Sequence, residues 1–156
     1  MKTPEEEFYG DPGPHPFMEA LAIGTLVGEP RRYVIEGRWV SKKNSKEILR
    51  RGRFGCRFVA SSHLYRRWER EAAVQLAGQN GGRPPIEGKV RVRLAIYLDK
   101  RQRTPDRDNA RSGPFDALQR AGVIRNDSQI VDDPLLIFRD EHRPRVEIMV
   151  EELVGE

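Results

Sequence analysis

The sequence is poor in cysteine and histidine, and it has no long apolar run. Cys56 is the only cysteine, which rules out an internal disulfide and argues against a thiolate metal cluster. The three histidines show no zinc-like spacing. Residues 18–27 are apolar but include Glu19 and follow acidic residues, which is untypical of a signal peptide, and no stretch is long enough to cross a bilayer. We therefore expect a soluble protein of the reducing cytoplasm.

A large excess of charge of one sign is also missing. The 156 residues include 28 Lys and Arg against 24 Asp and Glu, for a net charge of +4. The placement of the charges is therefore more informative than their sum. This length suits one domain with a modest core. The sequence has no P-loop, no dinucleotide-binding glycine pattern and no defensible Ser/His/Asp arrangement, which argues against those classes of enzyme.

Turn formers and hydrophobic patterning divide the chain into an arm, residues 1–30, and a folded domain, residues 31–152. Closely spaced prolines interrupt regular structure near the start, so we expect a poorly ordered arm, with a short helix over 17–26 as the alternative. The predicted elements of the domain are a strand over 33–40, a hairpin with a basic loop between Arg38 and Arg57, a helix from the N-cap Ser62 to Gly78, a half-buried strand over 90–98, a helix from about Ser112 to Gly122, and strands over 135–138 and 145–150. The second helix is expected to start near Ser112 because Pro114 is unfavourable beyond the first turn.

The hairpin is the most basic part of the sequence. Between Arg38 and Arg57, a run of lysines and arginines is opposed only by Glu47. A merely solvated hairpin is the simple alternative, but contact with nucleic-acid phosphates is favoured for so uncompensated a run. The candidate DNA-binding residues are Lys42, Lys43, Lys46, Arg50, Arg51, Arg53 and, further along the chain, Arg107.

Acidic residues gather between positions 104 and 129. Asp106 and Asp108 are two positions apart, so in an extended chain, which the preceding apolar run favours, both carboxylates project on one side. Two carboxylates at so short a distance repel each other. Either the pKa of one of them is raised, or a hard cation such as Mg²⁺ binds between them. The alternative is that Asp108 or Asn109 only caps a helix. An EF-hand is excluded because Ala117 stands where its bidentate Glu should be.

Carboxylates beside many Arg and Lys residues fit phosphoryl chemistry on a polyanion, in which a metal activates water. Seven short motifs support a more specific interpretation: Lys42-Lys43-Asn44-Ser45, 61–68, 105–109, 115–118, 122–123, 126–130 and 145–148. In their order and spacing these motifs resemble the RusA family of Holliday junction resolvases, over about residues 33–150.

The resemblance implies a small single α+β domain, with a mixed β-sheet and about two main helices, that forms a homodimer. It also implies that the protein nicks branched DNA in recombination and repair, in the cytoplasm at the nucleoid, with Mg²⁺ or Mn²⁺ as the cofactor. In that family the carboxylates that match Asp106, Asp108 and Asp127 form the catalytic metal site. Asp116 matches a further acidic position, which we place as a metal-site candidate at the rim.

One position departs from the family pattern. Where the family has an essential lysine in the first turn after its Asp-x-Asp-Asn motif, this sequence has Ser112. Arg111 is our candidate for the missing cation, although one helical step rotates a side chain by roughly 100°. The alternatives are a non-catalytic nucleic-acid-binding protein that has lost this lysine, and an RNA or single-strand nuclease that uses the same site.

Overall fold

The sheet of this protein is arranged around β4 (Val90–Leu98), a nine-residue strand that pairs on both sides. The structure is a computed structural model that describes residues 27–42, 46–51 and 55–155, and it describes the side chains of neither hairpin strand. The other strands of the sheet are β1 (Arg31–Glu36), β5 (Ile130–Asp132), β6 (Leu135–Arg139) and β7 (Arg145–Glu152). The predicted arm, residues 1–30, lies mostly outside the described residues, as does the alternative helix over 17–26.

The sheet is mixed, because strands of both directions flank β4. On one side β7 runs antiparallel to β4, with Val92 opposite Val150, and β1 runs antiparallel to β7 at the edge. On the other side β5 and β6 run parallel to β4. The helix α3 (Arg107–Arg120) and the short 3-10 helix η2 (Asp127–Gln129) lie between β4 and these parallel strands in the sequence. A strand that pairs parallel with an earlier one needs a long crossover connection, and α3 and η2 form the connection from β4 to β5.

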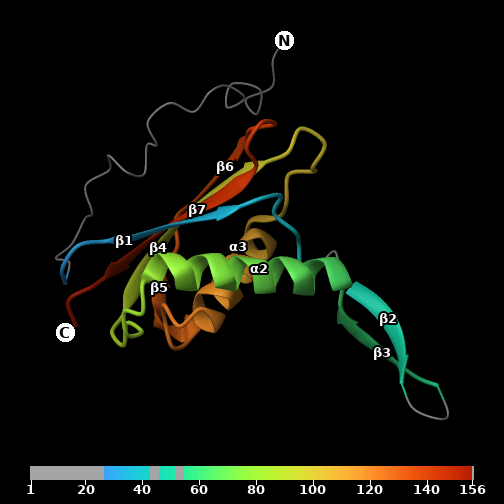
Figure 1. Cartoon of the computed structure of the whole chain (residues 1–156), viewed down its shortest axis with the longest axis horizontal. Helices are drawn as coiled ribbons and strands as arrows, with labels where there is room; N and C mark the ends of the chain where they lie inside the picture. Colours follow the sequence, from blue (N-terminus) through green and yellow to red (C-terminus); the bar gives the residue numbers. More distant parts are fainter. Residues whose placement is uncertain (1–26, 43–45, 52–54, 156) are drawn as a thin grey trace.

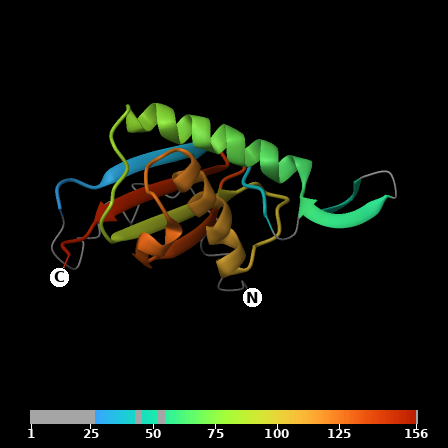
Figure 2. The ribbon, with the colours of Figure 1, turned by 90° about the horizontal axis from the view of Figure 1, so that it is seen from below.

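Both helices lie across one side of the sheet, and a separate hairpin projects beyond them (Figures 1 and 2). The long helix α2 (His63–Asn80) follows the hairpin of β2 (Lys46–Arg51) and β3 (Cys56–Ser61), which pair antiparallel as predicted. Ser62 caps α2 as predicted, since its Oγ accepts a hydrogen bond from the Tyr65 amide at 3.1 Å. The predicted α+β class is confirmed. None of the described helices is long and apolar enough to span a bilayer.

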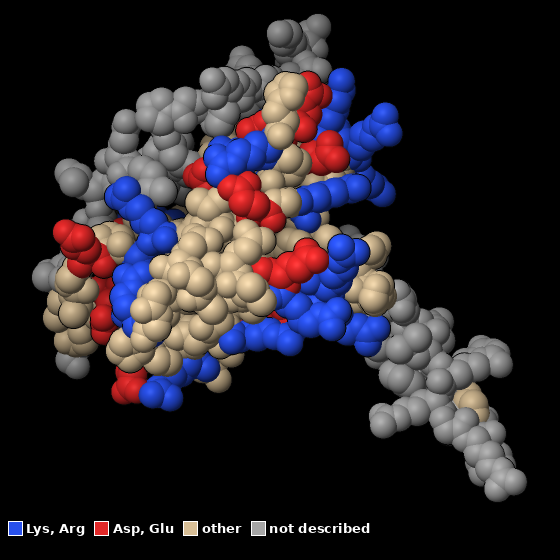
Figure 3. Space-filling view, viewed as in Figure 1, with Lys and Arg blue, Asp and Glu red and all other residues tan. Residues whose placement is uncertain are grey.

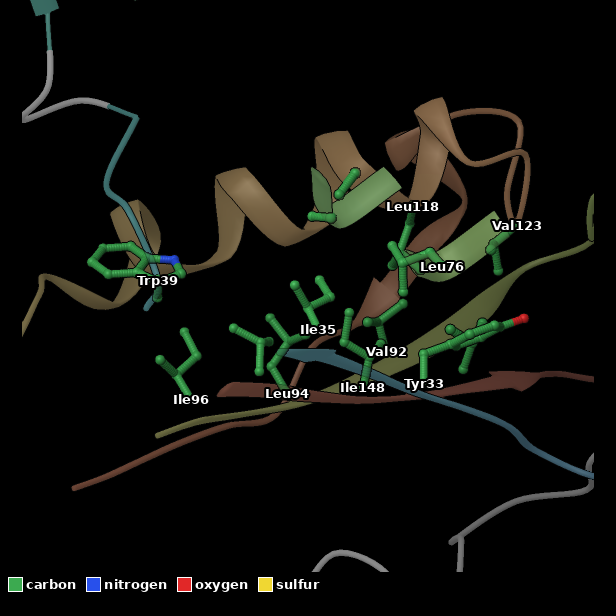
Figure 4. Close-up of a cluster of buried hydrophobic side chains, with 14 of the residues drawn as sticks. Tyr33, Ile35, Trp39, Leu76, Val92, Leu94, Ile96, Leu118, Val123 and Ile148 are labelled. Carbon is green, nitrogen blue, oxygen red and sulfur yellow. The ribbon is translucent and has the colours of Figure 1, made fainter. Parts of the chain in front are cut away.

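The hydrophobic core lies between the two helices and the sheet. Leu76 of α2 and Leu118 of α3 point toward Ile35, Val92 and Ile148 of the sheet, and all five are almost fully buried (Figure 4). Each such side chain contributes about 1.5–3 kcal/mol when fully buried. The apolar residues that recur with helical spacing in the helices and with strand spacing in the sheet therefore pack into one core.

Two glutamines of α2 close the free edge of β1. The Gln79 side chain accepts from the Val34 amide and donates to the Val34 carbonyl, both at 2.7 Å. Gln75 makes the same pair of bonds with Glu36, at 2.8 and 3.3 Å. Residues four apart on a helix are neighbours on its surface, and so they reach alternate residues of the strand. At these two positions β1 cannot pair with a further strand.

Two predicted boundaries and one predicted burial pattern are wrong. β1 ends at Glu36, because Gly37 turns the chain with a φ of 103°, and α2 runs through Gly78 to Asn80, where Gly81 adopts the left-handed conformation. β4 is buried on both faces and not on one. Its polar face is accommodated by pairing: Arg93 Nε lies 3.0 Å from Glu151 Oε2.

The predicted start of α3 is also wrong. The helix begins at Arg107, with Asp106 as the N-cap, and continues through Pro114. Asp106 and Asp108 therefore lie on a helix start and not on an extended chain. A proline inside a helix costs about 3 kcal/mol, because it lacks an amide and clashes with the preceding turn. Tertiary packing outweighs this cost: Gly113 and Pro114 are buried, and Gly113 lies against Trp68 of α2.

We predict that Gly113→Ala destabilises the protein by about 1–3 kcal/mol, because an added methyl group would meet Trp68 Cζ3 at 3.0 Å in a packed interface. Gly78→Ala is the matched control, since it is also a helical glycine but has nothing within 4 Å of the added methyl group. It should stabilise the protein by about 0.5–1 kcal/mol. Urea unfolding of both variants measures the difference, and equal effects would contradict this role of Gly113.

Candidate functional site

The predicted acidic residues lie at exposed positions of α3 and η2. Asp106 is at the N-cap position of α3 without a side-chain capping hydrogen bond, Asp108 is in the first turn, and Asp127 begins η2, which packs against α3. We call these three residues the acidic triplet. All three are exposed, and within the described part of the chain neither Asp106 nor Asp127 forms an ion pair. The N-terminal end of a helix carries partial positive charge, which favours carboxylates at the start of α3.

The segment that presents Asp127 is fixed by its own side chains. Asn126 Oδ1 accepts from the Ser128 amide at 2.9 Å. Gln129 Oε1 accepts from the Asn126 amide at 2.9 Å, and its Nε2 donates to the Ile86 and Gly88 carbonyls, both at 2.8 Å. The flanking polar residues of this motif are therefore structural. They hold Asp127 in place and leave its carboxylate exposed.

Arg111, the predicted replacement cation, lies beside the triplet. Its Nη1 is 3.5 Å from Asp108 Oδ1, and its Nε is 3.2 Å from Asp133 Oδ2 and donates to the Asp133 carbonyl. Asp133 was not among the predicted site residues, because only the fold brings it next to Arg111. Ser112 turns back on its own helix and donates to the Asn109 carbonyl at 3.1 Å. The guanidinium of Arg111 is thus held between two carboxylates close to the start of α3.

Asp116 is already engaged by two other side chains. Lys42 Nζ lies 2.6 Å from Asp116 Oδ2, and the Tyr65 hydroxyl donates to the same oxygen at 2.9 Å. Burial, together with the Asp116 charge, raises the pKa of Tyr65 well above its ordinary value. Eight residues separate Asp116 from Asp108, or about 12 Å along the helix axis. Asp116 therefore lies well away from Asp108 along α3, and its place at the rim of a metal site stays a prediction.

The base of the hairpin is attached to α3 next to the acidic triplet. Asn109 Nδ2 donates to Ser41 Oγ at 2.8 Å, and the adjacent Lys42 pairs with Asp116. Among the other predicted DNA-binding residues, Arg107 is exposed and donates to the Leu135 carbonyl at 2.6 Å. Lys43 and Arg53 lie outside the described residues, and Lys46, Arg50 and Arg51 belong to β2, whose side chains are not described.

The residues at the start of α3 suit Mg²⁺ in their chemistry. Within the described residues, no group of three His, Cys, Asp or Glu side chains is close enough to hold a metal ion. Mg²⁺, however, usually binds through one or two carboxylates, with waters and substrate phosphates as its other ligands. Exposed carboxylates such as Asp106 and Asp108 are ligands of this kind. The donor set therefore fits a metal that is shared with a bound phosphate.

Comparison with known proteins gives one family. A family model described as endodeoxyribonuclease RusA matches residues 37–151, which is well over half of the chain. The matched region contains the hairpin, both helices, the acidic triplet and nearly all of β7. No curated protein matches the sequence.

We predict that Tyr65→Phe lowers the free energy of unfolding by about 1.5–3 kcal/mol near neutral pH, the usual range for a hydrogen bond to a charged group. The folded-state pKa of Tyr65 is raised, so the stability due to its neutral hydroxyl is complete below the unfolded value of 10.0 and is lost as pH rises above it. The deficit of the variant should therefore stay constant up to about pH 9 and shrink above about pH 10 in urea unfolding. A deficit that does not change with pH would contradict this account of the Tyr65–Asp116 contact.

Proposed function

The chain belongs to the endodeoxyribonuclease RusA family of Holliday junction resolvases, and from that premise we propose that it is a Mg²⁺-dependent nuclease that nicks four-way DNA junctions. One observation carries the proposal: within the region that matches the family, α3 and η2 expose three carboxylates on packed, hydrogen-bonded elements. Recombination and repair of DNA in the cytoplasm, at the nucleoid, is the corresponding role.

In this proposal, the carboxylates of the acidic triplet, which do not form a closed metal site by themselves, would hold Mg²⁺ together with waters and the phosphate that is cleaved, with Mn²⁺ as a substitute. When bound, the metal activates water and stabilises the charge that develops on the phosphate. The chain supplies the position of the carboxylates. Asp106 and Asp108 are fixed by the packing of α3, and Asp127 is fixed by the hydrogen bonds of Gln129.

Arg111 supplies the cation of the site in this proposal. Its guanidinium is next to Asp108, and the carbonyl and carboxylate of Asp133 hold it in position. Ser112 carries no charge, and its hydroxyl is bonded within the helix. An arginine held near the scissile phosphate would stabilise negative charge in the transition state.

A homodimer completes the proposal. A four-way junction has nearly twofold symmetry, so a twofold-symmetric pair of subunits would present one acidic triplet to each of two strands. The same dimer could then cut both strands of one junction without releasing it. Gln75 and Gln79 cover the Val34 and Glu36 positions of β1, so another surface is expected to form the contact.

We predict that Asp106→Asn, Asp108→Asn and Asp127→Asn each abolish nicking of a synthetic four-way junction in Mg²⁺, because each removes a metal ligand. Junction binding should persist and tighten slightly, since less negative charge then faces the DNA. Nicking by the wild type with Mg²⁺ but not with EDTA is the reference. If the wild type binds the junction but does not nick it, the result supports a non-catalytic nucleic-acid-binding protein. If it cleaves only RNA or single strands, the result supports an RNA or single-strand nuclease.

We further predict that Arg111→Ala lowers the single-turnover nicking rate by about 10²- to 10³-fold, with little change in junction affinity, as for other single electrostatic stabilisers. Ser112→Lys should raise the rate, because it restores the family's charge on the same helix. Arg120→Ala is the matched control: it removes an arginine from α3 that pairs with Glu69 at 3.6 Å. If Arg111→Ala cuts like the control and Ser112→Lys gains nothing, Arg111 is not the cation of the site.

A further inference from the structure

The loop between β4 and α3, residues 99–104, is held firmly by side chains. Arg139 Nη1 donates to the Asp99 carbonyl at 3.0 Å and its Nη2 donates to Thr104 Oγ1 at 3.2 Å. Gln102 Nε2 donates to the Trp39 carbonyl at 2.7 Å, and its Oε1 accepts from the Asp99 amide. The loop is therefore fastened both to β6 and to the segment that follows β1.

This fastened loop presents arginines to solvent. Arg101 and Arg103 flank Gln102, and Arg38 precedes Trp39, so the Gln102–Trp39 hydrogen bond brings the three arginines into one region. We call Arg38, Arg101 and Arg103 the loop patch. All three are exposed, and none has an ion pair or hydrogen bond with a described residue. No described residue therefore neutralises their charges.

Three nearby acidic residues do not cancel the loop patch, because other cations already pair with them, whereas Asp99 of the loop itself has no ion pair with a described residue. Arg143 pairs with Glu36, Arg145 Nη1 lies 2.9 Å from Asp140 Oδ2, and Lys100 Nζ lies 3.6 Å from Glu141 Oε2. Blue side chains accordingly project at the upper right of the molecule, where this loop lies (Figure 3). The surface there keeps a local excess of positive charge.

Two arginines of the loop patch lie close in sequence to the start of α3, where Asp106 and Asp108 are. The loop leads directly from Thr104 to Asp106, the N-cap of α3. From Arg38 the chain continues to Ser41, which is bonded to Asn109, and then to the hairpin. The loop patch and the hairpin are therefore both connected to the start of α3 through short segments of chain.

We propose that the loop patch binds the phosphate backbone of a duplex arm of the DNA, separately from the arm that the hairpin contacts. Exposed guanidinium groups suit the phosphate backbone, and phosphate contacts fix the position of a duplex without reading its sequence. This inference deepens the proposed function, and it rests on that function for the identity of the DNA. Two separated contacts would hold the strand between them over the acidic triplet.

The test is the salt dependence of junction binding, measured in EDTA so that no DNA is cut. The variant Arg38→Ala/Arg101→Ala/Arg103→Ala should reduce the steepness of the slope of log K against log salt concentration by about 2–3, since each phosphate contact contributes about 0.9 to that slope. A Lys variant at the same three positions should keep the wild-type slope, because charge alone makes these contacts. Thermal unfolding checks that the fold is intact.

The matched control removes the same amount of charge elsewhere. Arg67, Arg120 and Arg125 are exposed arginines that pair with Glu71, Glu69 and Glu87. Their triple Ala variant should change the slope by less than about 1. If the loop-patch variant keeps the wild-type slope, or the control flattens it equally, the inference is overturned. Wild-type nicking in Mg²⁺ separates the two proposals: its absence removes the nuclease function alone, whereas an unchanged slope removes the loop patch alone.

Discussion

The close approach of α3 to α2 at Gly113 is the constraint on which the rest of the site depends. An added methyl group there would meet Trp68 Cζ3 at 3.0 Å, a tight contact that glycine avoids. At this spacing the Tyr65 hydroxyl of α2 reaches Asp116 of α3, and Asp116 in turn holds Lys42 at the base of the hairpin. One contact between helices thus sets the position of the acidic triplet relative to the basic hairpin.

Charges are sorted into engaged and available groups around this helix pair. Arg111 is held by Asp108 and Asp133, and Lys42 is held by Asp116, whereas Asp106 and Asp127 keep exposed carboxylates. Engaged cations keep their geometry when a polyanion approaches, because their side chains are already ordered. Available arginines can instead adapt to the backbone of DNA. The proposed division between chemistry at α3 and binding at the flanking basic surfaces follows from this sorting.

The sheet supports the site without contributing to it directly. β4 is buried on both faces, and its charged positions are matched by partners on neighbouring strands, such as Arg93 with Glu151. The glutamines of α2 close the edge of β1. A sheet that is satisfied in its core and along this edge provides a rigid base, so the groups proposed to act on DNA are carried on the helices, the loop and the hairpin.

The sequence by itself determined the class of the fold, the family and the elements with strong local signals. Ser62 predicted the start of α2, alternation predicted β4, and the spacing of the acidic motifs predicted the family that the comparison confirmed. The roles of the acidic triplet, Asp116 and Arg111 stay predictions. Tertiary structure alone decided that α3 starts at Arg107 and runs through Pro114, because burial of Gly113 against Trp68 outweighs a local cost that the sequence shows plainly. It also decided that Asp133 holds Arg111 and that Arg38 joins Arg101 and Arg103, because these neighbours are distant in sequence and only the packing of the loops and helices brings them together.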